Sequence, residues 1–432
     1  MTDIYEIAEY TLEALKKSGA DAAQCIVSKN KKDELNVDGG KFSLMRSTFN
    51  TSISMKAIKD GKKGVTSINQ ATKEAIDGAA AQCISAAQSS VPDEAEQIAP
   101  FTAKAEYKTG VFEPELDKLF DRIEEFMSQT AAEYPKIILE QLISDYEHSE
   151  KLYMNTNGTS LKYEHGEYSF NTMFSAHEGE KASSFNGYFC ALNSLDKPFM
   201  DAGMQRQLLA ESEKQLDTVS PSEKFVGRVI YSPDCFNELL QTALENFASS
   251  GVLIDGTSPW KDALNTKVAS EKLNLRSVPL DGRTVVGQRF TSDGYPVEDM
   301  DIIIDGVLKT FILSQYGANK TGFPRSLNSG NNLEVLPGNK ALEEMISGID
   351  RGLIVNRFSG GQPSSNGDFS GVAKNSFLIE NGKVVSAVSE TMISGNIIDM
   401  LNNIVAVSKE QTTDGLSFMP WAEFDGVTVS GK

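Results

Sequence analysis

The stretch Ile302-Ile-Ile-Asp-Gly-Val-Leu-Lys-Thr-Phe-Ile-Leu313 decides the fold expected for the second half of this chain. Two apolar runs flank an Asp-Gly pair, which suits a two-residue hairpin turn because both turn positions need positive φ. Phe377-Leu-Ile-Glu-Asn-Gly-Lys-Val-Val385 repeats the pattern around Asn-Gly. Further Asp-Gly turn signals stand at 281–282, 293–294 and 425–426. These patterns predict a sheet-dominated second half, with a packing helix over about 233–249 and a further helix within 393–404.

The first half alternates between helical and strand patterns. Apolar residues at helical spacing predict a first helix that Thr2 or Asp3 caps and Gly19 ends, and further helices over 72–89, 114–133 and 205–218. Strands are expected at 25–28 and over 137–189 with a turn at 157–158. Short runs within 35–65, broken at Asp38-Gly39-Gly40 and Lys59-Asp60-Gly61, predict a hairpin or meander. The fold class is therefore α+β.

A polar, proline-bearing joint, Ser220-Pro-Ser-Glu-Lys-Phe225, lies where the pattern changes. We expect the domain boundary there, which gives an N-terminal mixed α/β domain over 1–222 and a C-terminal β-rich domain over 223–432.

Charge and composition limit the classes of function. The 432 residues carry 60 acidic against 41 basic side chains, a net charge of −19, which argues against binding to nucleic acid or to anionic membranes. No basic, apolar leader follows Met1, and no apolar stretch is long enough to span a membrane. Four scattered cysteines without a C-x-x-C spacing are expected to be buried thiols, so a cytoplasmic location is predicted.

The run Arg357-Phe-Ser-Gly-Gly-Gln-Pro-Ser-Ser-Asn-Gly-Asp-Phe-Ser-Gly371 is rich in glycine without being low in complexity. Apolar runs at 353–355 and 377–379 flank it, which predicts a loop held between buried strands. Neither phosphate-binding glycine motif occurs in it. We favour a substrate-facing loop over a structural loop, and both over a nucleotide-binding loop.

Catalytic side chains are scarce. The only histidines are His148, His165 and His177, none in an H-E-x-x-H arrangement. A metal site at His177-Glu-Gly-Glu180 is disfavoured, because neighbours along a strand point to opposite faces. No G-x-S-x-G motif occurs, and no histidine follows His177 to act as a base.

Seven segments of the second half follow one another in an order that is hard to attribute to chance. They are Asp305-Gly-Val-Leu-Lys-Thr-Phe-Ile-Leu313, Asn332-Leu-Glu-Val-Leu-Pro-Gly338, Gly352-Leu-Ile-Val-Asn-Arg-Phe-Ser-Gly-Gly361, Gly367-Asp-Phe-Ser-Gly371, Ile379-Glu-Asn-Gly382, Ser389-Glu-Thr-Met-Ile-Ser-Gly-Asn-Ile-Ile-Asp-Met-Leu401 and Asp425-Gly-Val-Thr-Val429. Together they resemble the TldD/TldE (PmbA) family, once described as modulators of DNA gyrase and now treated as peptidases.

The resemblance breaks at the zinc motif. In the TldD branch an H-E-x-x-x-H helix and a cysteine near the C-terminus hold zinc, which acidifies a water. Aligning Ser232-Pro233 with the turn before that helix places Gln241-Thr-Ala-Leu-Glu-Asn246 at the motif. Gln241 and Asn246 replace both histidines, Thr242 replaces the glutamate, and 415–424 has no cysteine.

This pattern resembles the TldE (PmbA) branch. The resemblance implies a chain without zinc of its own, which pairs with a zinc-bearing TldD-like subunit around an extended peptide. Arg357, Ser359, Gly360, Gly361 and Asp368 are the candidate peptide-cleft residues. Arg357 is expected to bond either a peptide carbonyl or carboxylate, or a nearby acid as a structural ion pair.

Two other functions stay open. One is a stand-alone metallohydrolase with atypical ligands such as His177 and Glu178. The other is a regulatory binding protein, as the gyrase label implies. The sequence leaves open the peptide substrate and whether the chain forms a homodimer in isolation.

Overall fold

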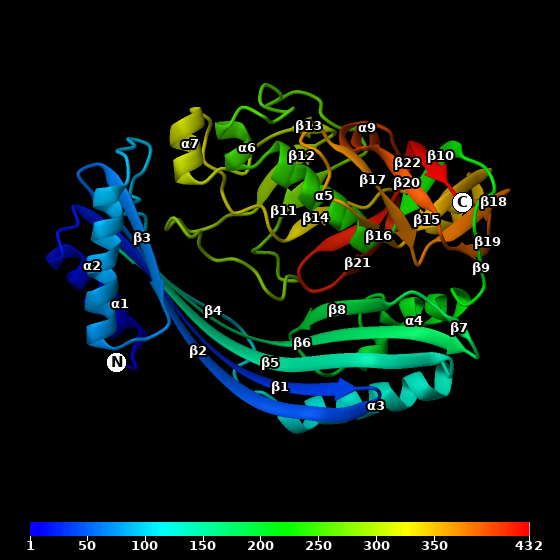
Figure 1. The fold of residues 1–432 in the computed structure, drawn as a ribbon, viewed down its shortest axis with the longest axis horizontal. Coiled ribbons are helices and arrows are strands. Elements are labelled where there is room, and N and C mark those ends of the chain that lie inside the picture. Colours follow the sequence, from blue (N-terminus) through cyan, green and yellow to red (C-terminus); the bar gives the residue numbers. More distant parts are fainter. Residues whose placement is uncertain (432) are drawn as a thin grey trace.

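The computed structural model describes residues 1–431, which form an eight-stranded and a fourteen-stranded sheet with helices packed on both (Figure 1). The fold is α+β, as predicted. The strands of the first sheet run in the order β3-β2-β1-β5-β6-β4, with β7 and β8 also paired to β6. Its strands are β1 Ala22–Asp38, β2 Lys41–Lys59, β3 Lys62–Ile68, β4 Lys104–Gly110, β5 Ile137–Asn155, β6 Ser160–Glu178, β7 Lys181–Ala182 and β8 Asn186–Leu192.

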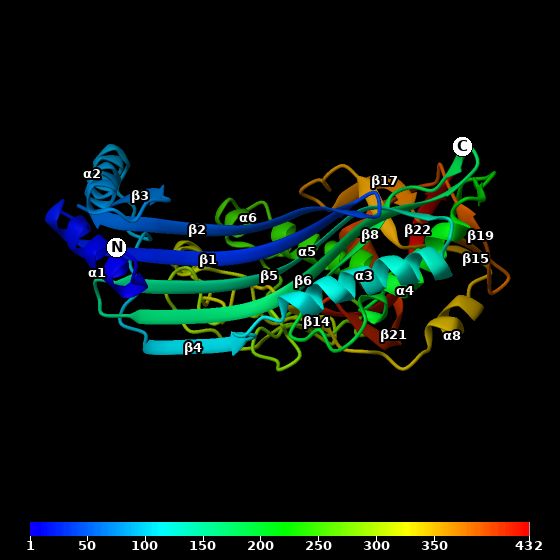
Figure 2. The same ribbon diagram turned by 90° about the horizontal axis from the view of Figure 1, so that it is seen from below.

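The first sheet is long and curved, and Figure 2 shows its main strands lying side by side. The meander predicted within 35–65 is confirmed, because β1 ends at Asp38, β2 spans Lys41–Lys59 and β3 begins at Lys62. Its middle strand β2 has 19 residues and is longer than the short runs predicted. Cross-strand pairing extends the strands well beyond the stretches where apolar residues alternate. The turn at Asp60-Gly61 was predicted and has positive φ at both positions.

Helices α1 (Ile4–Lys17) and α2 (Lys73–Ser89) pack together at one end of this sheet (Figure 1). The Asp3 carboxylate accepts hydrogen bonds from two backbone N–H groups of the first turn of α1, as a helix cap does. Helix α3 (Leu116–Glu133) buries a stripe of apolar side chains near the other end. Phe120 of the same helix is 37% exposed, and its ring stacks on Phe42.

A short 3-10 helix at Phe199–Asp201 and helix α4 (Gln205–Lys214) complete the first part. The helix predicted over 205–218 is too long, because residues 218–219 form β9, which pairs with β19 of the second sheet. The predicted domain boundary after residue 222 stays a prediction.

The second sheet contains strands β9 to β22 and is covered by short helices. The strands are β9 Thr218–Val219, β10 Phe225–Tyr231, β11 Leu275–Ser277, β12 Met300–Ile304, β13 Val307–Leu308, β14 Leu333–Val335, β15 Arg351–Val355, β16 Arg357–Gly360, β17 Asp368–Lys374, β18 Phe377–Glu380, β19 Lys383–Val388, β20 Met392–Asn396, β21 Ile404–Thr413 and β22 Phe418–Ser430. The helices are α5 Pro233–Phe247, α6 Ser250–Ile254, α7 Gln315–Thr321, α8 Leu342–Ser347 and α9 Ile397–Asn402.

Both hairpins expected from sequence are present. Strands β12 and β13 are joined through Asp305 and Gly306, with φ of 50° and 74°. Strands β18 and β19 are joined through Asn381 and Gly382, with φ of 51° and 74°. The predicted turn residues therefore occupy the left-handed positions that such turns require.

Two of three local predictions for the second half are wrong. Asp425-Gly426 lies inside β22, where the register with β10 shifts, so it makes a bulge and not a turn. The helix predicted within 393–404 is present as α9, and the residues before it form β20, which pairs with β17 and β22. The run Arg357–Gly371 is not a simple loop, because β16 and β17 pair antiparallel and leave only 361–367 between them.

The two sheets share a hydrophobic core cluster. Phe170 and Leu142 of the first sheet belong to the same cluster as Ile230, Ile379 and Trp421 of the second. Hydrogen bonds also cross between them, from Tyr188 Oη to the Thr413 carbonyl and from the Ala191 N–H to the Asp414 carbonyl. The second half is thereby held over one face of the curved sheet (Figure 1). No helix within residues 1–431 is long and apolar enough to cross a membrane.

Candidate functional site

Helix α5 is the element that all parts of the candidate site share. Ser232 caps it by accepting a hydrogen bond from the Cys235 N–H, and Pro233 occupies its first turn, where no N–H is needed. Apolar side chains at helical spacing, including Phe236, Leu240 and Phe247, are buried in the core of the second half. The opposite face carries Asp234, Asn237, Glu238, Gln241, Thr242 and Glu245, and it borders three cavities of the described chain.

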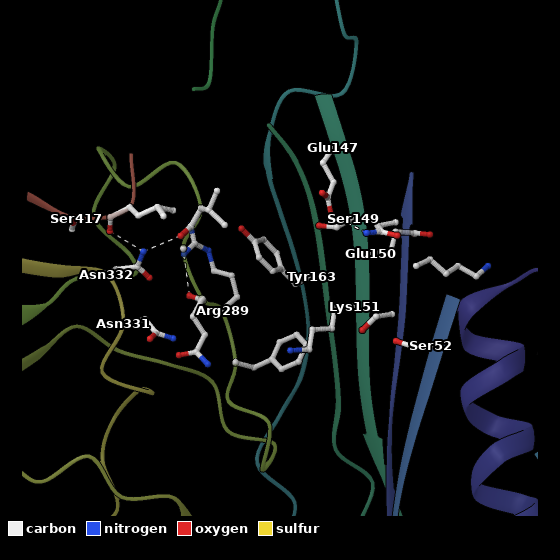
Figure 3. Close-up of a pocket in the computed structure, with 18 of the residues that line it drawn as sticks. Ser52, Glu147, Ser149, Glu150, Lys151, Tyr163, Arg289, Asn331, Asn332 and Ser417 are labelled. Carbon is white, nitrogen blue, oxygen red and sulfur yellow. Dashed lines mark hydrogen bonds between the residues drawn. The ribbon is translucent and has the colours of Figure 1, made fainter. Parts of the chain in front are cut away.

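The first cavity, here called the sheet cavity, has a volume of about 680 Å³ and separates the first sheet from loops of the second half (Figure 3). Gln241 and Asn237 are the α5 side chains that reach it. Many of the other lining residues have hydroxyl or amide side chains: Ser28, Asn30, Asn50, Thr51, Ser52, Ser149, Gln288, Asn331, Asn332 and Ser417. Charged residues also line it: Lys29, Glu147, Glu150, Lys151, Arg289 and Asp414.

The loops on the second side of the sheet cavity are tied together. Asn332 Nδ2 donates to the Val286 and Leu416 carbonyls, at 2.9 and 3.0 Å. Arg289 donates to the Pro279 carbonyl at 2.5 Å, and its guanidinium lies 5.6 Å from the Tyr163 ring centre. These contacts give the cavity a fixed wall (Figure 3).

One ammonium group in the sheet cavity is poorly hydrated. Lys151 of β5 lines it, with its Nζ 5.7 Å from the Phe290 ring centre. Burial lowers the pKa of Lys151, because removal from water disfavours its charged form.

The second cavity, the hairpin cavity, has a volume of about 420 Å³ and lies between α5 and the β16–β17 hairpin. It brings Gln241 and Thr242 together with Ser359, Gly360 and Gly361. The zinc-helix positions and the glycine-rich run, far apart in sequence, therefore face the same space.

Close packing explains one of the hairpin glycines. A Cβ on Gly360 would lie 2.6 Å from the Phe358 ring and 2.8 Å from the Ser370 carbonyl oxygen, which is closer than real contacts allow. Gly361, by contrast, has no atom within 4 Å of such a Cβ. Gly360 is thus needed to close the hairpin, whereas Gly361 leaves open space beside the cavity.

The third cavity, the N-turn cavity, has a volume of about 510 Å³ and lies beside the first turns of α5. Asp234, Glu238, Asn356 and Arg357 line it, opposite residues of β6 and β8. Arg357 Nη1 donates to the Phe185 carbonyl oxygen at 2.7 Å. The guanidinium therefore binds a backbone carbonyl of the chain itself. The expected partners were a peptide carbonyl or carboxylate, or a nearby acid in an ion pair, and this bond is neither.

Two carboxyl groups of the N-turn cavity have unusual acidities. Burial first, then the charges of Asp414 and Glu238, raise the pKa of Asp234 to about 6. Asp234 still reaches the cavity water, although protein surrounds it on most sides. Burial also raises the pKa of Glu238, and the charge of Arg357 opposes that rise in part.

Two predicted residues lie outside these cavities. Asp368 accepts hydrogen bonds at 2.9 Å from Asn366 Nδ2 and from Asn396 Nδ2, so it stabilises the hairpin and its neighbour β20. Asn246 is half-buried on α5 and lines none of the three cavities.

Sequence reasoning missed Asp234, Glu238 and Asn356. A signal for the first two was present, because residues four apart share one face of a helix. Asn356 lies one residue before the predicted cleft residue Arg357, yet nothing in the sequence marks it.

The residues of α5 do not fit a zinc ion. Its cavity-facing side chains are carboxylates, amides and a hydroxyl. Cys235 is buried, and burial raises its pKa well above the ordinary value. Across residues 1–431, no three or more His, Cys, Asp and Glu side chains are grouped so as to hold a metal ion.

The atypical ligands considered from sequence also point to separate partners. His177 hydrogen-bonds Ser175 at 2.9 Å, whereas Glu178 pairs with Lys136 at 2.9 Å. The structure does not bring His177 and Glu178 to a shared ligand position.

Comparison with known proteins gives consistent matches. The family model described as PmbA/TldA metallopeptidase C-terminal domain matches residues 224–431, and the model described as PmbA/TldA metallopeptidase domain 1 matches residues 23–87. Metalloprotease PmbA of Escherichia coli O157:H7 is 32% identical over 155 residues, which are 35% of this chain and 34% of that protein.

The Metalloprotease PmbA homolog of Buchnera aphidicola subsp. Acyrthosiphon pisum is 25% identical over 283 residues, which are 61% of this chain and 62% of that protein. The chain thus spans about a third to three-fifths of the length of these curated relatives. The crystal structure of TldE from Thermococcus kodakarensis superposes with a TM-score of 0.83 at 21% identity and covers 98% of this chain and 100% of that one. That likeness concerns the fold.

Proposed function

This chain belongs to the PmbA/TldD family of metallopeptidases, and we propose that it is the non-catalytic, peptide-cleft-forming subunit of a TldD/TldE-type zinc peptidase. In this proposal a TldD-like partner holds the zinc, and the complex acts in the proteolysis or maturation of peptides in the cytoplasm. The observation that carries the proposal is the cavity-facing surface of α5. It has Gln241 and Thr242 where the resemblance puts a zinc ligand and a catalytic glutamate.

The three cavities adjoin one another along α5 through shared lining residues, and this arrangement supports peptide binding. Gln241 lines both the sheet cavity and the hairpin cavity, and Glu238 lines both the hairpin cavity and the N-turn cavity. An extended peptide advances by about 3.3 Å per residue, so several residues can be accommodated along such a path.

The chemistry of the walls also suits a peptide backbone. The amide and hydroxyl groups of the sheet cavity, such as Asn50, Ser52 and Asn331, both donate and accept hydrogen bonds. Main-chain groups of an extended peptide offer the complementary partners, independently of its side chains. This chain would bind and orient the peptide.

The proposal is tested with the full chain purified alone and together with a TldD-like partner. We expect no stoichiometric zinc and no cleavage of an unfolded polypeptide by the chain alone, and cleavage once the partner is added. Size-exclusion chromatography of the same samples reports whether the chain forms homodimers without the partner. Cleavage by a zinc-free, partner-free preparation would overturn the proposal.

A further inference from the structure

The N-turn cavity contains negative charge that its surroundings leave uncompensated. Asp234 and Glu238 lie one turn apart on α5, and both side chains line the cavity. Among residues 1–431, neither carboxylate accepts a hydrogen bond or forms an ion pair. Both residues are exposed, so solvent hydrates the carboxylates and leaves them free to pair with a ligand that enters the cavity.

Further charges around the cavity add to this imbalance. Asp414, which lines the adjoining sheet cavity, lies close enough to raise the pKa of Asp234. Glu211 lies behind Asn356 and accepts a hydrogen bond from it. Of the described residues that line this cavity, Arg357 is the single positively charged one. Its guanidinium donates a hydrogen bond to the Phe185 carbonyl.

Asn356 supplies an independent observation. Only 9% of this residue is exposed, and it lines the cavity. Its Nδ2 donates to Glu211 Oε2 at 2.6 Å, which fixes the orientation of the amide. The other end of the amide, Oδ1, is buried and has no hydrogen-bond partner within residues 1–431. A buried acceptor without a donor is costly, and a donating group that displaces the wall slightly and reaches Oδ1 from the cavity would remove that cost.

The opposite side of the cavity is apolar in part. Met173 and Phe185 of the first half line it with 41% and 54% of their surfaces exposed, next to the buried side chains Met204 and Leu208. An aliphatic chain that ends in a charged group suits such a space, because its methylenes cover apolar surface while its head meets polar atoms.

We propose that the N-turn cavity is a subsite for a cationic group of the bound peptide, which donates hydrogen bonds to Asp234, Glu238 and the Asn356 amide oxygen. The inference rests on the proposed peptide-binding function. The cation is an ammonium or guanidinium, from either the peptide N-terminus or a Lys or Arg side chain. The raised pKa of Asp234 agrees with this role, because a bound cation supplies the counter-charge that the carboxylate lacks.

The test uses the full-length chain and three synthetic peptides of one unstructured sequence. The reference peptide is N-acetylated and carries norleucine at its central position. The second has lysine there, and the third keeps norleucine but has a free N-terminus. Calorimetry at neutral pH is expected to show binding of all three, with at least one cationic peptide about tenfold tighter than the reference. Which of the two binds tighter identifies the source of the cation.

Variants locate the preference. Asp234→Asn combined with Glu238→Gln is expected to abolish the tenfold preference while the reference peptide still binds. Glu271→Gln removes one exposed carboxylate far from the three cavities and is expected to keep the preference. Circular dichroism of each variant checks that it is folded.

The outcomes separate this inference from the proposed function. Equal affinity for all three peptides, or a preference that survives the double substitution, overturns the cation subsite and leaves the peptide cleft standing. No binding of any peptide to the chain or to its complex with a TldD-like partner overturns both.

Discussion

The middle and the first turns of α5 face adjoining cavities but differ in chemistry. In the middle, Gln241 and Thr242 are neutral and can both donate and accept hydrogen bonds. In the first turns, Asp234 and Glu238 are carboxylates without donors in the described chain. On one helix, neutral side chains lie at the positions where the family resemblance puts the zinc motif, and carboxylates lie where the proposed cation would bind.

The largest effect on stability is expected from a substitution in the β16–β17 hairpin, which borders the hairpin cavity beside Gln241 and Thr242. Gly371→Ala would put a Cβ against the Phe358 ring and 2.7 Å from the Gly360 Cα, inside the β16–β17 hairpin. Overpacking of this kind costs about 1–3 kcal/mol, so thermal unfolding should show a clear fall in Tm. Binding of the reference peptide should weaken as well.

Gly361→Ala is the matched control for this substitution. A Cβ there meets no atom within 4 Å, so Tm should stay close to that of the wild type. Equal losses for Gly361→Ala and Gly371→Ala would show that close packing in the hairpin does not distinguish the two positions.

A smaller effect of opposite sign is expected for Asp234→Asn. The folded-state pKa of about 6 exceeds the ordinary value of 3.8, so between these pH values the folded chain binds more protons than the unfolded chain. The free energy of unfolding therefore falls as pH rises through this window, by about 1 kcal/mol after screening by cavity water. Asn does not ionise, so the variant should be the more stable protein above pH 6.

Unfolding in urea at several pH values measures this effect. The advantage of Asp234→Asn should vanish below pH 3.8, where the wild-type carboxyl is protonated in both states. A variant less stable than the wild type at neutral pH would show that the Asp234 carboxylate has a stabilising partner. A gain in stability together with a loss of cation preference would also separate binding from folding.

Arg357→Ala tests the effect of the positive charge in the N-turn cavity. The substitution removes the guanidinium that reduces the charge imbalance near Glu238, and it breaks one hydrogen bond to a backbone carbonyl. We expect a stability loss of about 1 kcal/mol or less and a few-fold tighter binding of the cationic peptide. Arg357→Lys keeps the charge and should bind that peptide as the wild type does; weaker binding by Arg357→Ala would contradict this role.

The smallest effect concerns salt. Raising ionic strength should weaken the binding of the cationic peptides by a few-fold and leave the affinity for the reference peptide nearly unchanged. The reason is that salt screens charge pairs but hardly affects neutral hydrogen bonds. Titrations in low and high salt compare the two. An equal loss for all three peptides would place the salt effect outside the N-turn cavity.

Much of the fold was predictable because it depends on local signals. Asp305-Gly306 and Asn381-Gly382 adopt the positive φ of their turns, and Asp3 caps α1 as expected. The failures occur where pairing with distant strands overrides the local pattern. Asp425-Gly426 lies inside β22 as a bulge, and residues 218–219 pair with β19 as β9 instead of extending α4.

The candidate site was predictable only in part. The degenerate helix positions Gln241 and Thr242 and the hairpin residues 359–361 were identified from the family resemblance, and the structure places them around one cavity. Asp234, Glu238 and Asn356 carried no such label. These three residues stand out because their side-chain oxygens lack hydrogen-bond donors in the described part of the folded chain. A sequence does not show which donors lie near a side chain.

The sequence by itself determined the α+β class, the C-terminal hairpins and the absence of any histidine after His177, since each depends on residue identity and local spacing. Only the tertiary structure decided that α5 borders three cavities and that its first turns line one of them together with Asn356. The physical reason is that burial, charge imbalance and unsatisfied hydrogen bonds arise between segments far apart in the chain. They exist only once both sheets have packed together.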